Sequence, residues 1–200
     1  MRGFYFITDS SLSLKGNISD VKDAISCGVK FIQYREKNAT TYFLYKEALT
    51  LRKICKDVKF IINDRVDIAL AVDADGVHLG KDDLPIKVAR KLLGKDKIIG
   101  ISVKSVKEAI SAERQSANYV SIGPIFFTTT KKNAHKPVGI SVIREIKKNI
   151  NIPLVAIGGI NLKNAKGVID AGADCICAIS AVVGKPNLKE IIKKFNSLFK

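Results

Sequence analysis

No uninterrupted apolar run in this sequence approaches the roughly 20 residues that a membrane-spanning helix requires. The chain goes straight into a strand-like run, residues 4–7, without the apolar stretch of a signal peptide before it. We therefore expect no membrane association, and the predicted location is the cytoplasm.

Zinc-ligand patterns are also missing. The four cysteines are Cys27, Cys55, Cys175 and Cys177, and no second cysteine pair or histidine lies at zinc-ligand spacing from them. Cys175 and Cys177 stand two apart in an apolar run, so in a strand both side chains point to the same side. There, cysteine usually behaves as a small core residue, which is the interpretation we favour over a metal or redox role.

Acidic residues are scarce, since 19 Asp and Glu stand against 34 Lys and Arg, for a formal net charge of +15. The lysines are spread along the chain, with no arginine-rich arm and no basic block interleaved with aromatic residues. This distribution favours solvated helix faces, and no nucleic-acid partner is expected. A positive field would still help to recruit anionic substrates.

Linkers and low-complexity tracts are absent, so residues 1–200 are predicted to form a single domain, with 46% hydrophobic residues to build its core. Short apolar or β-branched runs alternate with amphipathic segments. The predicted strands are 4–8, 29–35, 60–63, 76–79, 98–103, 119–122, 154–157 and 174–179. The predicted helices are about 19–26, 41–56, 66–72, 85–93, 105–116, 139–149, 162–171 and 187–198.

Apolar strands that alternate with amphipathic helices pair in parallel, because each crossover helix returns the chain to the same edge of the sheet. Eight such units predict a closed (β/α)8, or TIM, barrel near the lower length limit of that fold. An open doubly wound sheet is the alternative. It usually has a glycine-rich first turn, however, and residues 8–11 contain no glycine.

In such a barrel the active site lies at the carboxyl ends of the strands. The second predicted strand carries Gln33, Arg35 and Lys37, which share one side because strand side chains alternate. Arginine binds phosphate oxygens as a fork and lysine as a mobile charge, so this row fits a polyanion above the barrel. The alternative is a strand that leaves the sheet into a solvated loop.

Acidic residues follow the third and fourth predicted strands, at Asp64 and at Asp82-Asp83. Neighbouring strands lie about 5 Å apart, so carboxylates at the two exits can converge on one hard cation. Mg²⁺ fits best, because it takes one or two carboxylates together with waters and substrate phosphate oxygens. The competing interpretation is that Asp82 or Asp83 caps the helix that follows Pro85.

The loops after the last three strands predict a phosphate site. Thr128, Thr130 and Lys131 supply hydroxyls and a cation, while the Gly158-Gly159 and Ile179-Ser180 segments offer backbone amides.

Aromatic residues and histidines give weaker evidence for a functional site. Phe126 and Phe127 either wall a heterocycle or pack in the core. We expect His78 and His135 to be structural or solvated, because no acid or nucleophile partner stands at a suggestive spacing.

Taken in order, these segments resemble the thiamine-phosphate synthase family over nearly the whole chain. The motifs that carry the resemblance are Tyr5-Phe6-Ile7-Thr8-Asp9, Gln33-x-Arg35-x-Lys37, Ile62-Asn63-Asp64-Arg65, Gly76-Val77-His78-Leu79-Gly80 with Asp83-Leu84-Pro85, Gly100-Ile101-Ser102-Val103, Gly123-Pro124 with Thr128-x-Thr130-Lys131, and Ala156-Ile157-Gly158-Gly159-Ile160. Each is weak alone, but seven in order at compatible spacing are specific.

The resemblance implies a transferase that joins 4-amino-5-hydroxymethyl-2-methylpyrimidine diphosphate to 4-methyl-5-(2-phosphoethyl)thiazole, or its carboxylate, and releases pyrophosphate. It implies that the pyrimidine diphosphate is contacted by Gln33, Arg35, Lys37, Asn63, Ser102 and Lys131. It implies that Asp64 and Asp83 hold Mg²⁺, and that the thiazole phosphate is held by Thr128, Thr130, Gly159, Ile179 and Ser180. Arg35, Lys37, Ser102 and Lys131 would be the catalytic residues. Whether the chain forms homo-oligomers stays open.

The chain departs from the family pattern at Thr129, where the family usually has proline between the two loop threonines. A related thiazole tautomerase relies on a histidine two residues beyond the position of Ser102, where this chain has Lys104. That difference favours the synthase over the tautomerase. A non-catalytic barrel that binds phosphate ligands, or a basic nucleic-acid binder, is the alternative from another functional class.

Overall fold

The computed structural model describes residues 1–130 and 136–199. In these residues eight strands alternate with eight helices. The strands are β1 (Gly3–Ile7), β2 (Phe31–Tyr34), β3 (Lys59–Asn63), β4 (Gly76–Leu79), β5 (Ile98–Val103), β6 (Tyr119–Ile122), β7 (Leu154–Ile157) and β8 (Cys175–Cys177). The helices are α1 (Asn17–Ser26), α2 (Thr41–Ile54), α3 (Val66–Ala71), α4 (Ile86–Leu93), α5 (Val106–Arg114), α6 (Ser141–Asn149), α7 (Ala165–Asp170) and α8 (Leu188–Ser197).

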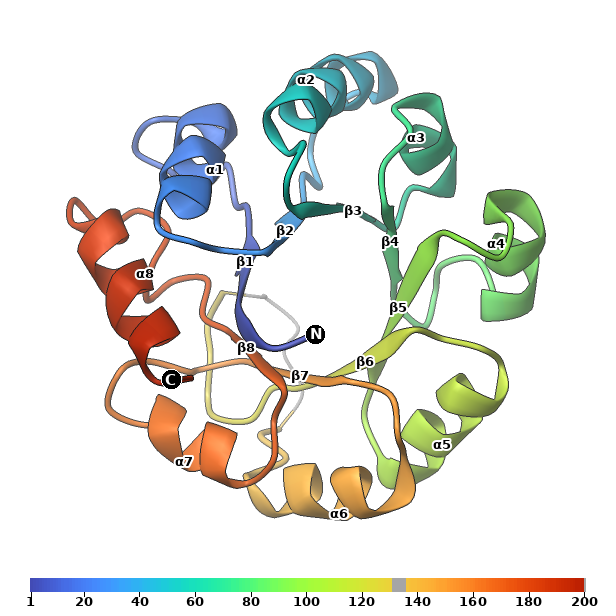
Figure 1. The fold of residues 1–200 in the computed structure, drawn as a ribbon, viewed down its shortest axis with the longest axis vertical. Coiled ribbons are helices and arrows are strands. Elements are labelled where there is room, and N and C mark those ends of the chain that lie inside the picture. The colour runs from blue at the N-terminus through green and yellow to red at the C-terminus, as the bar shows by residue number, and fades with distance from the viewer. Residues whose placement is uncertain (131–135, 200) are drawn as a thin grey trace.

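Each strand pairs in parallel with the next, and β1 also pairs with β8, so the sheet closes into a barrel. Figure 1 looks along the barrel and shows the strands as an inner ring with the helices around it. The predicted (β/α)8 barrel is confirmed. Because all strands run the same way, their carboxyl ends and the loops that follow them gather at one end of the barrel.

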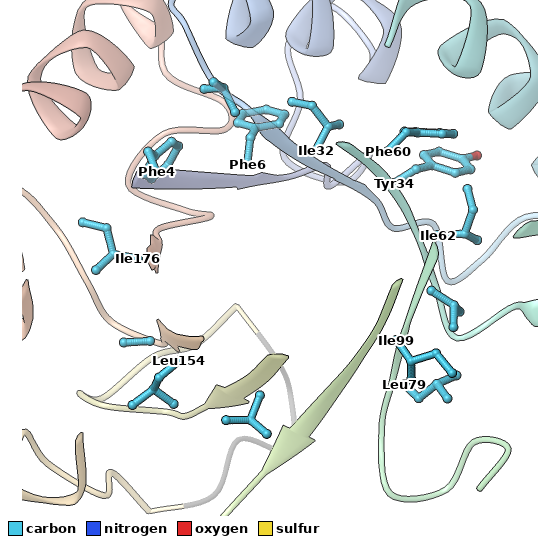
Figure 2. Close-up of a cluster of buried hydrophobic side chains, with 14 of the residues drawn as sticks. Phe4, Phe6, Ile32, Tyr34, Phe60, Ile62, Leu79, Ile99, Leu154 and Ile176 are labelled. Atoms are coloured by element: carbon cyan, nitrogen blue, oxygen red, sulfur yellow. The ribbon is translucent and has the colours of Figure 1, made fainter. Parts of the chain in front are cut away.

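Side chains alternate between the two faces of each strand. In β1, Phe4 and Phe6 belong to the apolar layer between the strands and the helices, whereas Tyr5 and Ile7 belong to the barrel interior. Figure 2 shows members of the outer layer from several strands, including Ile32 and Ile176, directed away from the barrel axis. This layer is the larger of the two cores and holds the helices on the barrel.

The barrel interior is a smaller core. Tyr5, Tyr119 and Val155 pack there with Cys175 and Cys177, and all five are almost completely buried. Both β8 cysteines therefore lie on the same side of the strand, as their spacing predicts, and they act as core residues. Burial raises the pKa of the Cys175 thiol to about 12, so this thiol stays protonated at neutral pH.

Element boundaries differ from the predicted ones by a few residues. Thr40 caps α2, since its hydroxyl accepts a hydrogen bond from the Phe43 N–H, and Gly94 ends α4 with a φ of 77°. Pro85 precedes the first residue of α4 instead of lying in its first turn. The second strand ends at Tyr34, earlier than predicted, so Arg35 stands in the loop that follows it.

Across residues 1–130 and 136–199, no helix is both long enough and apolar enough to cross a membrane.

Candidate active site

A cavity of about 390 Å³ opens at the carboxyl ends of the strands. It is lined by residues that the sequence places at the strand exits. Those that line the cavity are Gln33, Arg35, Lys37, Asn63, Asp64, Asp83, Ser102, Thr128, Thr130, Gly159, Ile179 and Ser180. All the predicted site residues within the described part of the chain thus face one space. Lys131 and His135 lie outside the described residues.

The loop after β2 brings two cations to the cavity. The Arg35 N–H donates to Thr8 Oγ1 (2.9 Å), and the Thr8 hydroxyl donates back to the Arg35 carbonyl (3.2 Å), which fastens this loop to the end of β1. The Arg35 guanidinium donates to the Asp9 carboxylate (3.2 Å), which also accepts from the Ser11 hydroxyl. Asp9 is buried, so it holds Arg35 in a fixed orientation, a role that the sequence analysis did not assign.

The exits of β3 and β4 bring two carboxylates together. Asp64 has a left-handed backbone with a φ of 62°, and its N–H donates to the His78 carbonyl of β4 (2.8 Å). This conformation, which aspartate tolerates better than most residues, turns the chain sharply out of β3. The pKa of the Asp83 carboxyl is raised, first by burial and further by the nearby Asp64. Two carboxylates this close together are a favourable donor pair for a cation.

Hydrogen bonds at these carboxylates involve cavity groups rather than a helix cap. Asp83 accepts from the Gly80 N–H (2.6 Å), whereas α4 has no side-chain cap at its start. The alternative that Asp83 caps this helix is therefore wrong. The Lys37 ammonium forms an ion pair with Asp64, so a cation already neutralises this carboxylate.

The metal prediction is compatible with this donor set. Among the described residues, no group of three or more His, Cys, Asp and Glu side chains is arranged to hold a metal ion. Two carboxylates suffice for Mg²⁺ when substrate phosphate oxygens and waters complete its shell. Asp64 and Asp83 thus fit a magnesium ion that arrives with a phosphorylated substrate better than one held by protein ligands alone.

The opposite side of the cavity is built from the loops after β6 and β7. The Ile125 and Phe126 N–H groups donate to the Ile157 and Gly158 carbonyls (3.0 Å each), which ties the two loops together. Gly159 has a φ of 64°, and a Cβ there would lie 2.4 Å from the Phe127 carbonyl oxygen. Only glycine fits this position, and the close approach of the two backbones depends on it.

Hydroxyl groups from the β6 loop face this same side. The Thr130 N–H donates to Thr128 Oγ1 (3.3 Å), and the Thr128 hydroxyl donates to Thr130 Oγ1 (3.2 Å). Neither Phe126 nor Phe127 lines the cavity, and the Phe127 side chain is 77% exposed. The interpretation of these two residues as an aromatic wall is not supported, and Phe127 is not a core residue either.

The floor of the cavity contains polar groups to which the sequence analysis assigned no functional role. The His78 ring is buried, and its Nε2 lies 3.0 Å from the Ser102 hydroxyl. Burial lowers the pKa of His78 to about 4, so its imidazole is neutral at pH 7. Glu108 also lines the cavity, and its carboxylate accepts from the Lys104 N–H (2.7 Å). The sequence analysis did not single out Glu108, although Ser105 and Glu108 have the spacing of a capping box and Ser105 Oγ accepts from the Glu108 N–H (3.2 Å).

The closed barrel and the polar cavity at its carboxyl end define an enzyme of the (β/α)8-barrel class. Comparison with known proteins narrows this class. The family model described as "Thiamine monophosphate synthase" matches residues 4–182. The chain belongs to this family.

Several relatives resemble the chain over most of its length. It is 53% identical to a thiamine-phosphate synthase of Methanosarcina barkeri, over 96% of this chain and 88% of that protein. It is 48% identical to a thiamine-phosphate synthase of Clostridium novyi, over 92% of both chains. A solved structure of thiamine phosphate pyrophosphorylase from Pyrococcus furiosus superposes with a TM-score of 0.90 at 40% identity, over 98% of this chain and 95% of the other.

Proposed function

We propose that this protein is a transferase that joins 4-amino-5-hydroxymethyl-2-methylpyrimidine diphosphate to 4-methyl-5-(2-phosphoethyl)thiazole and releases pyrophosphate. When the carboxylate of the thiazole is used instead, CO2 is released as well. Membership of the family supports the reaction. The observation that carries the proposal is one cavity with cations and a carboxylate pair on one side and a glycine and hydroxyl loop on the other. This layout suits two substrates that each carry phosphate.

The diphosphate end of the proposal rests on Arg35 and Lys37. Arg35 is oriented by Asp9, and an arginine held in this way offers its remaining N–H donors to phosphate oxygens. Lys37 is paired with Asp64 and exchanges this partner for phosphate oxygens when substrate enters. Lys131 belongs to the same set by the resemblance, and Asn63 with Gln33 and Ser102 would contact the rest of the pyrimidine substrate.

Asp64 and Asp83 would hold Mg²⁺. The ion supplies positive charge that stabilises the charge developing on the leaving pyrophosphate. Arg35, Lys37 and Lys131 supply the same stabilisation from the protein, and fixed cations in a site of low dielectric act more strongly than cations in water.

The thiazole phosphate end rests on neutral donors. Thr128 and Thr130 offer hydroxyl groups, and Gly159 and Ser180 offer backbone amides. At Gly159 no side chain stands between the amide and the ligand. Ile179 closes this subsite with an apolar contact. Neutral donors bind a phosphate that stays intact, whereas the cations are kept for the phosphate that leaves.

In the reaction, the bond between the pyrimidine methylene carbon and the pyrophosphate oxygen breaks, and the thiazole nitrogen lone pair forms the new C–N bond. The aminopyrimidine ring is electron-rich and supports positive charge on its methylene, so departure of pyrophosphate precedes attack. The ring nitrogen needs no base to remove a proton. The protein therefore contributes orientation and exclusion of water rather than a covalent nucleophile.

The test is synthesis of thiamine phosphate by the purified protein from both substrates and Mg²⁺, with and without a chelator. Asp64→Ala and Lys131→Ala are each expected to lower kcat by about 100- to 1000-fold with little loss of folding stability. Asp170→Ala is the matched control, because Asp170 is exposed on α7 and its ion pair within the described part of the chain is with Lys166. Unchanged turnover in both site variants would refute the assignment of the diphosphate end.

The same assay separates the alternatives. A thiazole tautomerase would isomerise the thiazole phosphate without consuming the pyrimidine diphosphate. A non-catalytic barrel would bind phosphate ligands and form no product, and a nucleic-acid binder would show salt-dependent binding instead.

A further inference from the structure

A chain of hydrogen bonds crosses the buried floor of the cavity from one wall of the barrel to the other. The Gln33 amide Nε2 donates to the Tyr5 hydroxyl (3.0 Å), and the Tyr5 and Tyr119 hydroxyl oxygens are 2.8 Å apart. Tyr119 Oη lies 2.9 Å from His78 Nδ1, and His78 Nε2 lies 3.0 Å from Ser102 Oγ. Gln33 and Ser102 line the cavity, as do Tyr5 and His78 between them, whereas Tyr119 is buried away from it.

Given that Gln33 Nε2 donates to Tyr5, only one direction gives every proton along this row of hydrogen bonds an acceptor. Tyr5 accepts from the Gln33 amide, so its one hydroxyl proton goes to Tyr119. In this direction Tyr119 donates its own proton to His78 Nδ1, which then accepts without a proton of its own. A neutral imidazole with a bare Nδ1 carries its proton on Nε2 and donates it to Ser102. The Ser102 hydroxyl proton is then free to donate to a ligand in the cavity.

We propose that Tyr5, Tyr119 and His78 are positioning residues that hold the Gln33 carbonyl oxygen as an acceptor and the Ser102 hydroxyl as a donor toward the pyrimidine ring. This inference rests on the proposed function, since it assumes that the ring binds between Gln33 and Ser102. It adds a physical basis for the choice between an aminopyrimidine and an oxopyrimidine.

The substrate class follows from the pattern at the two ends. An aminopyrimidine offers an N–H donor, which suits Gln33, and a ring-nitrogen lone pair, which suits Ser102. The corresponding oxopyrimidine turns the amino donor into a carbonyl acceptor and places a hydrogen on a ring nitrogen. The Gln33 carbonyl would then face another acceptor, and Ser102 would lose the lone pair to which it donates. A site built for hydrogen bonds rejects a ligand that leaves its buried polar groups unpaired.

The surroundings keep the chain in this state. Burial raises the pKa of Tyr119, so the phenol stays protonated. The Tyr119 ring lies against Gly100, where a Cβ would come within 2.0 Å of its Cζ atom, so the absence of a side chain at this position makes room for the ring.

The first experiment compares kcat/KM for the aminopyrimidine diphosphate and its oxo analogue in wild type, Tyr119→Phe and Tyr34→Phe. Loss of the Tyr119 hydroxyl separates the two halves of the chain, so the Gln33 amide and the His78 tautomer are each free to reverse. We expect the amino-over-oxo ratio to fall by about tenfold or more, the value of one hydrogen bond.

Tyr34→Phe is the matched control. Tyr34 is equally buried, but its ring lies outside the barrel in the outer layer, as Figure 2 shows. This variant is expected to keep the wild-type ratio within about twofold. A purely structural role for Tyr119 would lower stability without changing the ratio, so an unchanged ratio in Tyr119→Phe overturns the inference. If Tyr119→Phe does not fold, Tyr5→Phe breaks the same chain one step earlier and must show the same loss.

The second experiment needs no variant and no activity. The sequence has only two histidines, so ¹⁵N NMR of the wild-type protein at neutral pH resolves the tautomer of His78. We expect a protonated Nε2 and an unprotonated Nδ1, and a proton on Nδ1 overturns the inference. If neither pyrimidine diphosphate gives product, the proposed function fails, and the NMR result still decides the direction of the chain.

Discussion

Gly100→Ala is the substitution for which the structure gives the sharpest expectation. A Cβ at position 100 would lie 2.0 Å from Cζ and 2.4 Å from the hydroxyl oxygen of Tyr119. Gly100 has an ordinary backbone conformation, so alanine brings no backbone strain and the effect is steric alone. The Tyr119 ring is fully buried and paired on both sides through its hydroxyl, so it cannot move without breaking those bonds.

Overpacking of this kind costs about 1–3 kcal/mol of the free energy of unfolding. For a chain of this size, a loss of about 2 kcal/mol lowers Tm by about 4–8 °C. Thermal and urea unfolding followed by circular dichroism measure both quantities. The displaced hydroxyl also interrupts the chain between Tyr5 and His78, so the amino-over-oxo selectivity is expected to fall in this variant as well.

Gly167→Ala provides the control for this substitution. Gly167 lies on the exposed face of α7. The nearest atom to a Cβ added there would be the flexible Ile140 Cδ1, 3.7 Å away. The same chemical change is therefore expected to raise stability by about 1 kcal/mol through helix propensity. A Gly100→Ala protein with the wild-type Tm, or with a Tm above it, would refute the steric reasoning.

Three further predictions concern other parts of the chain. Asp9→Asn removes the charge that holds Arg35, and kcat/KM for the pyrimidine diphosphate is expected to fall by about tenfold or more in steady-state assays. Asp75→Ala, at the opposite end of the barrel, removes the acceptor of the Phe60 N–H (2.9 Å) and is expected to lower stability by about 2 kcal/mol while both KM values stay unchanged. A thiol reagent is expected to modify Cys27 alone in the folded protein and all four cysteines in denaturant, because the other three are buried.

The sequence was sufficient for the barrel because its strands and helices differ in periodicity. Continuous apolar runs and amphipathic segments alternate without a break, and the predicted and observed boundaries of β4, β5, β6 and β7 coincide. Boundaries were less accurate where tertiary contacts decide them. The β2 segment ends early because the hydrogen bonds of Arg35 go to Thr8, a residue 27 positions away.

The cavity residues were also predictable, because parallel strands place all their exits at one end of the fold. The partners of those residues were not. Asp9 holds Arg35 across 26 positions, and Tyr5 meets Tyr119 across 114. Such pairs depend on the register of the closed sheet, which no local pattern encodes. His78 illustrates the limit, since its hydrogen-bond partners Tyr119 and Ser102 come from two other parts of the chain.

The two ends of the cavity rest on different kinds of structure, and this difference has consequences for specificity. The hydrogen-bonded side chains that connect Gln33 to Ser102 all stand on strands. They lie at the barrel interior, where side chains have little freedom. The groups proposed for the thiazole phosphate come from loops, including Thr128 and Gly159. Recognition of the ring is therefore built into the rigid part of the fold, whereas recognition of the second substrate depends on loop backbone. Substitutions in the buried chain should change ring selectivity while the KM for the thiazole phosphate stays constant, and a parallel rise in both KM values would show that the two ends are not separate.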